Sequence, residues 1–234
     1  MKIAILISGF PRTFKSCYQS LFDNLININN HDFDFYLYTW QPSKNQHNSN
    51  LKNENNIYDS DELLETYKPK KYAFEDVDEW MKINKFKTGQ WYTLQKCWEL
   101  MESTNIKYDL VIRYRYDCLI RKPYYISNIV SQIVTPRDCY RGYDKDNQRV
   151  LINLKDNVDY INDYCCINDK LAIGNYDIMK IYCNVQDEYF ILLDDKKKIT
   201  TVNQLSTEGT LAEYLKKYSI DWVYDPKLII KINR

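Results

Sequence analysis

The first seven residues, MKIAILI (1–7), form a nearly uninterrupted apolar run. Such a run is typical of a strand that is buried on both faces, as in a parallel sheet. It ends at SGFPRT (8–13), where glycine and proline break the pattern. Apolar side chains then recur at helical spacing from residue 13 to about 28, and an alternating, aromatic-rich stretch follows at 33–40. This order predicts a βαβ unit, and hence an α/β fold with its first loop at the carboxyl edge of the sheet.

The rest of the chain continues to alternate between helical and strand patterns. The clearest helix is predicted at 88–104, where Trp91, Leu94, Trp98 and Met101 share one face. Further patterns predict helices at 60–67, 169–183 and 206–218, strands at 70–74, 108–117 and 222–230, and a strand-rich middle at about 130–153. We expect a single domain over residues 1–234. The polar, asparagine-rich stretch 41–57 is expected to be a mobile loop within it that covers a site.

Composition excludes several classes of protein. Lys+Arg 32 against Asp+Glu 32 gives a net charge of +0, so no nucleic-acid footprint is expected. No apolar run approaches the roughly 18 residues of a membrane span, and the start of the chain lacks the cleavage pattern of a signal peptide. The seven cysteines contain no C-x-x-C pair, which is typical of free thiols in a reducing compartment. We therefore expect a cytoplasmic protein without a membrane span.

The predicted strand 108–117 changes from apolar to charged at its end. Ligands of open α/β sheets lie outside the carboxyl ends of strands, so Arg113, Arg115 and Asp117 are candidates for ligand contact. Asp117 offers a hard oxygen donor for Mg²⁺ or Mn²⁺, and the two arginines suit phosphate groups or hold Asp117 in place. The alternative is a surface ladder of ion pairs on an edge strand.

The loop after the first strand is the second candidate site. It presents backbone N–H groups and a helix N-terminus, to which Arg12 would add a bidentate grip on phosphate. Ser8 and Gly9 precede it. The alternative is a tight turn with an exposed arginine, because a single glycine is not a dinucleotide or P-loop fingerprint.

Other acidic residues carry weaker signals. Asp169 and Glu208 are candidate bases near predicted helix starts, although the helix dipole favours acids there without any function. Four D-x-D strings occur, at 32/34, 59/61, 76/78 and 144/146, but about two would arise by chance. His31 and His47 are not placed for a catalytic triad.

Several segments resemble one family, in the family's own order. They are KIAILISGFPRTF (2–14), DFYLYTW (34–40), QWYTLQKCWEL (90–100), YDLVIRYRYD (108–117), NDKLAIG (168–174) and Glu208 with Leu211. This set is similar to the glycosyltransferase-like proteins of bacteria and large DNA viruses. The resemblance implies a GT-A-like (Rossmann-like) fold with a mixed, mostly parallel sheet flanked by helices. It also implies a nucleotide-diphosphate sugar as donor, with UDP as the first choice.

By position, the resemblance implies roles for individual residues. Ser8, Gly9 and Arg12 would face the nucleotide, Gln90 and Tyr92 would begin the helix beside it, and Asp117 would hold Mn²⁺ or Mg²⁺ or the sugar phosphate. Two departures stand out. Arg115 replaces the first acid of a D-x-D motif, and the C-terminal half has no histidine to serve as a third metal ligand.

The expected function is therefore transfer of a sugar from a nucleotide-diphosphate donor to a hydroxyl of a glycan or protein acceptor. Asp169 is the first choice as general base and Glu208 the second. The first alternative is a catalytically silent protein that binds nucleotide sugars or acts as a scaffold. The second is a nucleic-acid-binding module, suggested by the interleaved tyrosine and arginine residues at 113–125 and opposed by the zero net charge.

Overall fold

A computed structural model describes residues 1–41, 58–83, 89–126, 132–136, 142–143, 149–150, 167–189, 191–192 and 207–233. It confirms an α/β fold with a mixed, mostly parallel sheet flanked by helices. The predicted loop 41–57 lies outside the described residues except for Gln41. None of the helices within the described ranges is long and apolar enough to cross a membrane.

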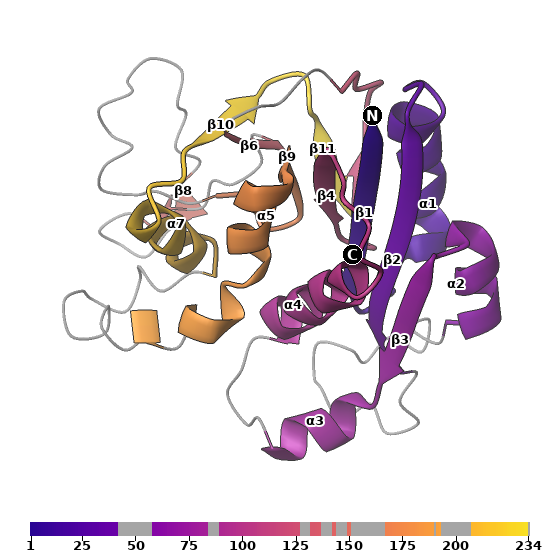
Figure 1. Cartoon of the computed structure of the whole chain (residues 1–234), viewed down its shortest axis with the longest axis horizontal. Helices are drawn as coiled ribbons and strands as arrows, with labels where there is room; N and C mark the ends of the chain where they lie inside the picture. The colour runs from indigo at the N-terminus through magenta and orange to yellow at the C-terminus, as the bar shows by residue number, and fades with distance from the viewer. Residues whose placement is uncertain are drawn as a thin grey trace.

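Helices and strands alternate in the first part of the chain, whereas strands β4 to β9 follow helix α4 with no helix between them among the described residues (Figure 1). The strands are β1 (Lys2–Gly9), β2 (Asp32–Trp40), β3 (Lys71–Glu75), β4 (Leu110–Tyr114), β5 (Cys118–Ile120), β6 (Ile133–Pro136), β7 (Gly142–Tyr143), β8 (Arg149–Val150), β9 (Leu171–Asn175), β10 (Trp222–Asp225) and β11 (Ile230–Ile232). The helices are α1 (Phe14–Leu21), continued by a π-helical turn η1 (Phe22–Ile26), α2 (Ser60–Tyr67), α3 (Val77–Ile83), α4 (Gly89–Glu102), α5 (Tyr176–Cys183) and α7 (Thr207–Lys217).

The main sheet has seven strands among the described residues, in the order β10-β6-β9-β4-β1-β2-β3. β1 pairs in parallel with β2 on one side and with β4 on the other, whereas β9 runs antiparallel to both β4 and β6. From β1 the chain first adds strands in one direction, to β2 and β3, and then returns to β4 on the other side. The reversal lies between β1 and β4, and open sheets bind ligands at the carboxyl ends of strands at such a point.

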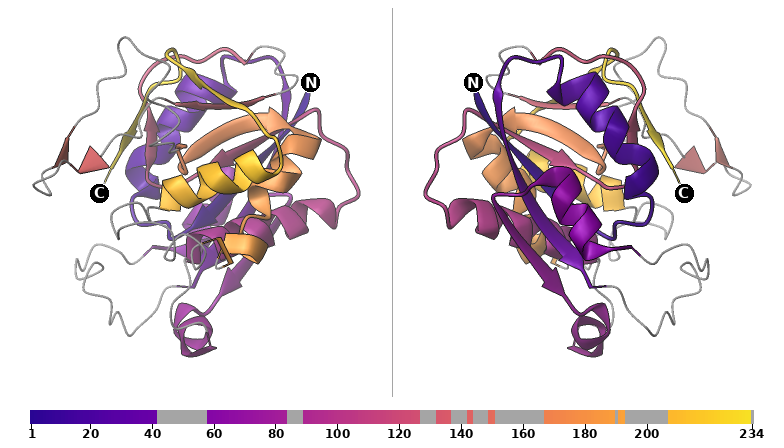
Figure 2. Two further views of the ribbon diagram at one scale, coloured as in Figure 1. Left: turned by 90° about the vertical axis from the view of Figure 1, so that its left-hand side faces the viewer. Right: turned by 90° about the vertical axis from the view of Figure 1, so that its right-hand side faces the viewer.

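The two faces of the sheet carry two hydrophobic cores, because successive side chains of a strand point to opposite faces. On β1, Ile3, Ile5 and Ile7 belong to the core covered by α1 and α2. Ala4 and Leu6 belong to the core covered by α4, α5 and α7. Figure 2 shows these two helix layers from opposite sides. β1 is apolar at every position because it is buried on both faces.

Three local predictions were wrong. The predicted helix 169–183 begins as strand β9, and only Tyr176–Cys183 is helical, with Asn175 as its N-cap. The predicted strand 222–230 is two strands: β10 pairs with β6 in the main sheet, whereas β11 pairs with β5. The sequence analysis also missed helix α3. The strand of Arg113 is not at an edge, since β4 lies between β1 and β9.

Candidate functional site

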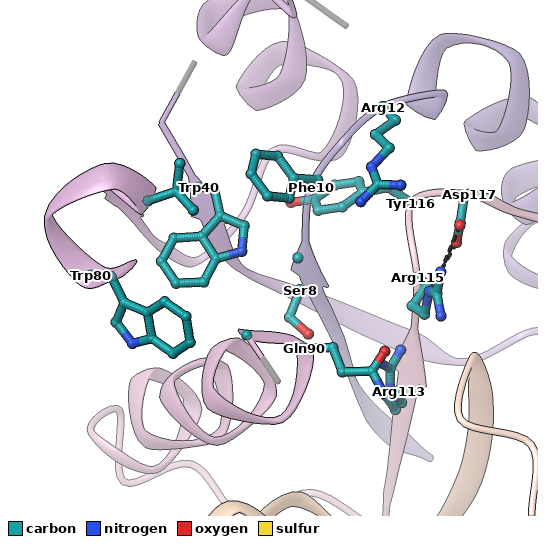
Figure 3. A pocket seen from close by; sticks show the side chains of 13 residues that line it. Ser8, Phe10, Arg12, Trp40, Trp80, Gln90, Arg113, Arg115, Tyr116 and Asp117 are labelled. Carbon is teal, nitrogen blue, oxygen red and sulfur yellow. Dashed lines mark hydrogen bonds and ion pairs between the residues drawn. The ribbon is translucent and has the colours of Figure 1, made fainter. Parts of the chain in front are cut away.

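A cavity of about 250 Å³ opens at the carboxyl ends of β1, β2 and β4, where the strand order reverses (Figure 3). It is lined by Ser8, Gly9, Phe10, Arg12, Trp40, Val77, Trp80, Gly89, Gln90, Arg113, Arg115, Tyr116 and Asp117. The two candidate sites of the sequence analysis therefore form one cavity. Its volume is close to the lower end of small-ligand pockets, about 300 Å³.

The loop after β1 has a backbone shape that requires glycine. Gly9 has a φ of +106°, a value that side chains with a Cβ rarely adopt, although no atom lies within 4 Å of where a Cβ would be. The turn carries Arg12 into the cavity, where its guanidinium lies 5.6 Å from the centre of the Phe10 ring. Ser8 is buried, and its hydroxyl has no hydrogen-bond partner within the described part of the chain.

Arg113, near the end of β4, is the most unusual group of the cavity. Its side chain is 0% exposed, and Nη1 donates to the carbonyl oxygen of Lys170 at 3.2 Å. Nε and Nη2 have no hydrogen-bond partner among the described residues, and no described carboxylate forms an ion pair with the guanidinium. The carboxylate of Asp169 acts on Arg113 electrostatically but is itself paired with Lys170 and Arg115. Two buried N–H donors without partners are costly, so this guanidinium is suited to bind an anion.

Arg115 and Asp117 form a bidentate ion pair across the turn after β4. Nε of Arg115 donates to one carboxylate oxygen at 3.0 Å, and Nη2 donates to the other at 2.6 Å. Nη1 of Arg115 also donates to Asp169 at 3.5 Å. Burial acts to lower the pKa of Arg115, but the charges of Asp117 and Asp169 outweigh it and raise that pKa.

The two candidate bases belong to one charge network beside the cavity. Nζ of Lys170 lies 2.8 Å from an oxygen of Asp169 and 3.4 Å from one of Glu208. Burial acts to raise the pKa of Asp169, but Lys170, Arg115 and Arg113 lower it to about 2. Asp169 is thus held ionised.

The position of Asp169 differs from the sequence interpretation. It precedes strand β9 and not a helix, in a turn where the Asn168 side chain accepts from the backbone N–H groups of Lys170 and Leu171. Nε2 of Gln90, which lines the cavity, donates to Asp169 at 3.0 Å. Glu208 does lie in the first turn of a helix, α7, as expected. Neither acid lines the cavity itself, and their role as bases stays a prediction.

An aromatic wall closes one side of the cavity, and the sequence analysis missed it. Trp40, at the end of β2, lies 5.2 Å from Trp80 of α3 and 6.1 Å from Phe10, measured between ring centres. Tyr92 does not line the cavity and stacks on Trp40 from behind, at 6.0 Å. The position of Trp40 at the end of the predicted strand 33–40 was a signal that could have identified it, whereas Trp80 could be found only by recognising helix α3.

Two of the D-x-D strings have structural explanations. Asp59 caps α2 by accepting from the backbone N–H groups of Asp61 and Glu62, and Asp76 likewise accepts from those of Asp78 and Glu79 at the start of α3. Asp34 is engaged at the amino end of the sheet, away from the cavity. The string at 144/146 lies outside the described residues.

The donors in the cavity do not fit a resident divalent cation. Asp117 is the one carboxylate among the described lining residues, and both of its oxygens accept from Arg115. No group of three or more His, Cys, Asp or Glu side chains within the described ranges is arranged to hold a metal ion. The predicted Mn²⁺ or Mg²⁺ therefore stays a prediction to be settled by titration. The four described cysteines are buried free thiols.

Comparison with known proteins adds no family to this geometry. The chain matches no protein-family model and no curated protein sequence.

Proposed function

We propose that this protein is a glycosyltransferase that moves a sugar from a nucleoside-diphosphate donor to an acceptor hydroxyl. The observation that carries the proposal is the buried guanidinium of Arg113, whose Nε and Nη2 lack partners among the described residues, in the cavity at the strand reversal. Arg12 lines the same cavity. Guanidinium groups bind phosphate oxygens through paired N–H donors, so the cavity suits a diphosphate.

Three further features support a nucleotide-sugar as the ligand. Gly89 and Gln90 bring the N-terminus of α4, a 14-residue helix, to the cavity, and such an end favours anions. Trp40 and Trp80 offer aromatic surface for a sugar or a base. The ordered resemblance to glycosyltransferase-like proteins and the mixed α/β sheet agree with this class of ligand.

The chemistry requires stabilisation of a leaving diphosphate. As the bond from sugar to phosphate breaks, the sugar becomes oxocarbenium-like and negative charge grows on the diphosphate. Arg113 and Arg12 would stabilise that charge, and Gln90 would help to orient the donor. Asp169 or Glu208 would accept the proton of the acceptor hydroxyl. Of the two, the lowered pKa of Asp169 makes it the weaker proton acceptor, which favours Glu208 if a base is needed.

A catalytically silent nucleotide-sugar-binding protein is the second candidate. It is favoured by one observation: the ion pairs of Lys170 engage both Asp169 and Glu208, and neither acid lines the cavity. Such a protein would keep the anion site without a carboxylate available to accept a proton.

A donor panel separates the two candidates. The purified chain is incubated with UDP- and GDP-sugars, UDP-sugars first, with glycan and peptide acceptors, and release of the nucleoside diphosphate is measured. A transferase releases it faster with an acceptor, and Arg113→Met abolishes the release, whereas Arg121→Met, at an exposed arginine outside the cavity, leaves it unchanged. Glu208→Gln and Asp169→Asn then test the two bases. Donor binding without release in any mixture selects the silent protein, and no donor binding contradicts both.

A further inference from the structure

The charges that line the cavity are strongly unequal. Three arginines, at positions 12, 113 and 115, face one carboxylate, Asp117, among the described lining residues. A divalent cation that neutralises a diphosphate is held by at least one carboxylate together with the phosphate oxygens, so such a cation would depend on Asp117 among these residues. The cavity instead supplies positive charge from the chain itself.

Asp117 is already committed to a cation, the guanidinium of Arg115. The two N–H donors reach both carboxylate oxygens, at 3.0 and 2.6 Å, in the fork arrangement that Arg and carboxylate groups prefer. The side chain of Asp117 is only 8% exposed, which leaves little room for the waters that complete the coordination shell of Mg²⁺. A divalent cation at Asp117 would also lie beside the positive charge of Arg115 and be repelled by it.

Arg113 provides the donors that a diphosphate needs. Its one described hydrogen bond, to the carbonyl oxygen of Lys170, fixes the guanidinium in place, and Nε and Nη2 remain without partners in the described structure. The Ser8 hydroxyl, also buried and unpartnered there, lines the same cavity. An anion that accepts from these groups would satisfy donors whose burial is otherwise costly.

We propose that the cavity binds a diphosphate directly on Arg113, with Arg12 and the start of α4, and without a divalent cation. Asp117 is then a positioning residue that holds Arg115 and is not a metal ligand. This inference deepens the proposed function and rests on it for the identity of the nucleotide, but the binding of a bare diphosphate can be tested alone.

Access to Arg113 requires a side chain to move. Because no part of Arg113 is exposed, an anion reaches it only after a neighbour turns aside. Gln90 lines the same cavity as Arg113, and its Nε2 donates to Asp169 at 3.0 Å.

The test is calorimetric titration of the whole chain with inorganic pyrophosphate and with UDP and GDP, first in EDTA and then in Mn²⁺. We expect pyrophosphate to bind in EDTA and Mn²⁺ to tighten binding by less than about threefold, which is under 1 kcal/mol. Arg113→Met should weaken binding at least about tenfold, the usual effect of losing a charged hydrogen bond. Arg121→Met is the matched control and should bind like the parent.

Asp117→Asn discriminates between the two roles of Asp117. It removes one negative charge from the cavity, so pyrophosphate should bind in EDTA at least as tightly as it does to the parent. If Asp117 were a metal ligand, Asp117→Asn would instead weaken the binding of pyrophosphate in Mn²⁺. Binding that requires Mn²⁺ and is lost in Asp117→Asn overturns the inference and leaves the transferase proposal standing.

Two further outcomes are informative. Absence of pyrophosphate binding both in EDTA and in Mn²⁺ also overturns the inference, provided that circular dichroism shows the chain to be folded. The transferase proposal fails in a different way: pyrophosphate then binds without a cation, while no nucleotide sugar is bound or turned over. That result leaves the cation-free anion site supported.

Discussion

The two ends of the central strands carry hollows of opposite character. At the amino end, a hollow is lined by Lys2, Asp34 and Lys70 among others, and the charges of these three side chains are paired with one another. Asp34 accepts from Lys70 at 2.7 Å and from the Tyr108 hydroxyl at 2.7 Å, and Lys2 lies 3.9 Å away. At the carboxyl end, Arg113 is fully buried, and two of its donors have no partner within the described ranges.

This difference shows why a hollow alone does not identify a site. The amino-end charges are satisfied by one another and are partly exposed, so they need no ligand and contribute modestly to stability. The guanidinium at the carboxyl end is buried and incompletely satisfied, which a fold tolerates where a ligand completes the arrangement. The following predictions test this contrast, from the largest expected effect to the smallest.

Asp169→Asn should cost about 2–3 kcal/mol of unfolding free energy at pH 7, because it removes a buried carboxylate from Lys170 and Arg115, which keep only Glu208 and Asp117 as partners. The folded-state pKa of Asp169 is lowered to about 2, so its stabilisation is present above its usual pKa of 3.8 and is lost as the pH falls through about 2. Urea denaturation at several pH values measures the unfolding free energy of the parent and of Asp169→Asn.

The gap between parent and Asp169→Asn should therefore narrow between about pH 4 and pH 2 and stay constant from pH 5 to pH 7. Asp177→Asn, at an exposed acid in the first turn of α5, is the control and should change stability by at most about 1 kcal/mol. A gap that widens as the pH falls contradicts the assignment.

Gly9→Ala should cost about 2 kcal/mol, because alanine is strained at a φ of +106° even though the space for its Cβ is open. Thermal or urea unfolding measures the loss. Gly89→Ala is the comparison variant, because Gly89 has no positive φ and its added Cβ would instead make a close contact, 3.0 Å from Cζ2 of Trp40. Any cost of that variant is therefore steric. A cost below about 0.5 kcal/mol for Gly9→Ala would show that backbone strain does not shape the loop after β1.

Arg113→Met should leave the unfolding free energy unchanged or raise it by about 1 kcal/mol, because a buried charge is replaced by an apolar side chain. The Lys170 carbonyl keeps a donor, the backbone N–H of Arg115 at 3.0 Å. The same urea titration is used. A loss of stability above about 2 kcal/mol, typical of a broken buried hydrogen-bond network, would show that Arg113 is a structural residue.

Asp34→Asn should cost under about 1 kcal/mol, since its charged partners are partly exposed lysines and the amide oxygen can still accept from the Tyr108 hydroxyl. It should leave pyrophosphate binding unchanged, because Asp34 lies in the other hollow. Calorimetric titration of Asp34→Asn and of the parent with pyrophosphate measures the two affinities. A change in affinity larger than about threefold would mean that the two ends of the sheet are coupled.

The elements that were predicted correctly have long or strongly alternating patterns. β1, β2, α2 and α4 agree with the sequence to within a few residues. The run LAIG (171–174) is too short for its periodicity to separate strand from helix, and pairing with β4 decides that it is β9. The stretch 222–230 is apolar on both sides of Pro226, and the two parts join different sheets because they meet different partners.

The candidate site was predicted in its outline and not in its interactions. The sequence indicated two candidate sites, after β1 and at the end of β4, and because parallel strands end at a common edge, Arg12 and Asp117 line one cavity. The pairing of Arg115 with Asp117, and of Lys170 with Asp169 and Glu208, depends on distances that no spacing predicts. Trp80 reaches the cavity from α3, which the sequence interpretation left out.

Local chemistry in the sequence was enough to establish an α/β chain whose first and fourth strands end in groups suited to an anion. Periodicity and the position of charges relative to apolar runs are properties of the chain itself, so they can be read without coordinates. Which of those charges neutralise one another was decided only by the pairing of β9 with β4 and by the packing of α4 against β1 and β2. Strand β4 lies between β9 and β1, so Arg113 is held inside the sheet and its side chain is buried. Two donors of that side chain, Nε and Nη2, have no partner among the described residues.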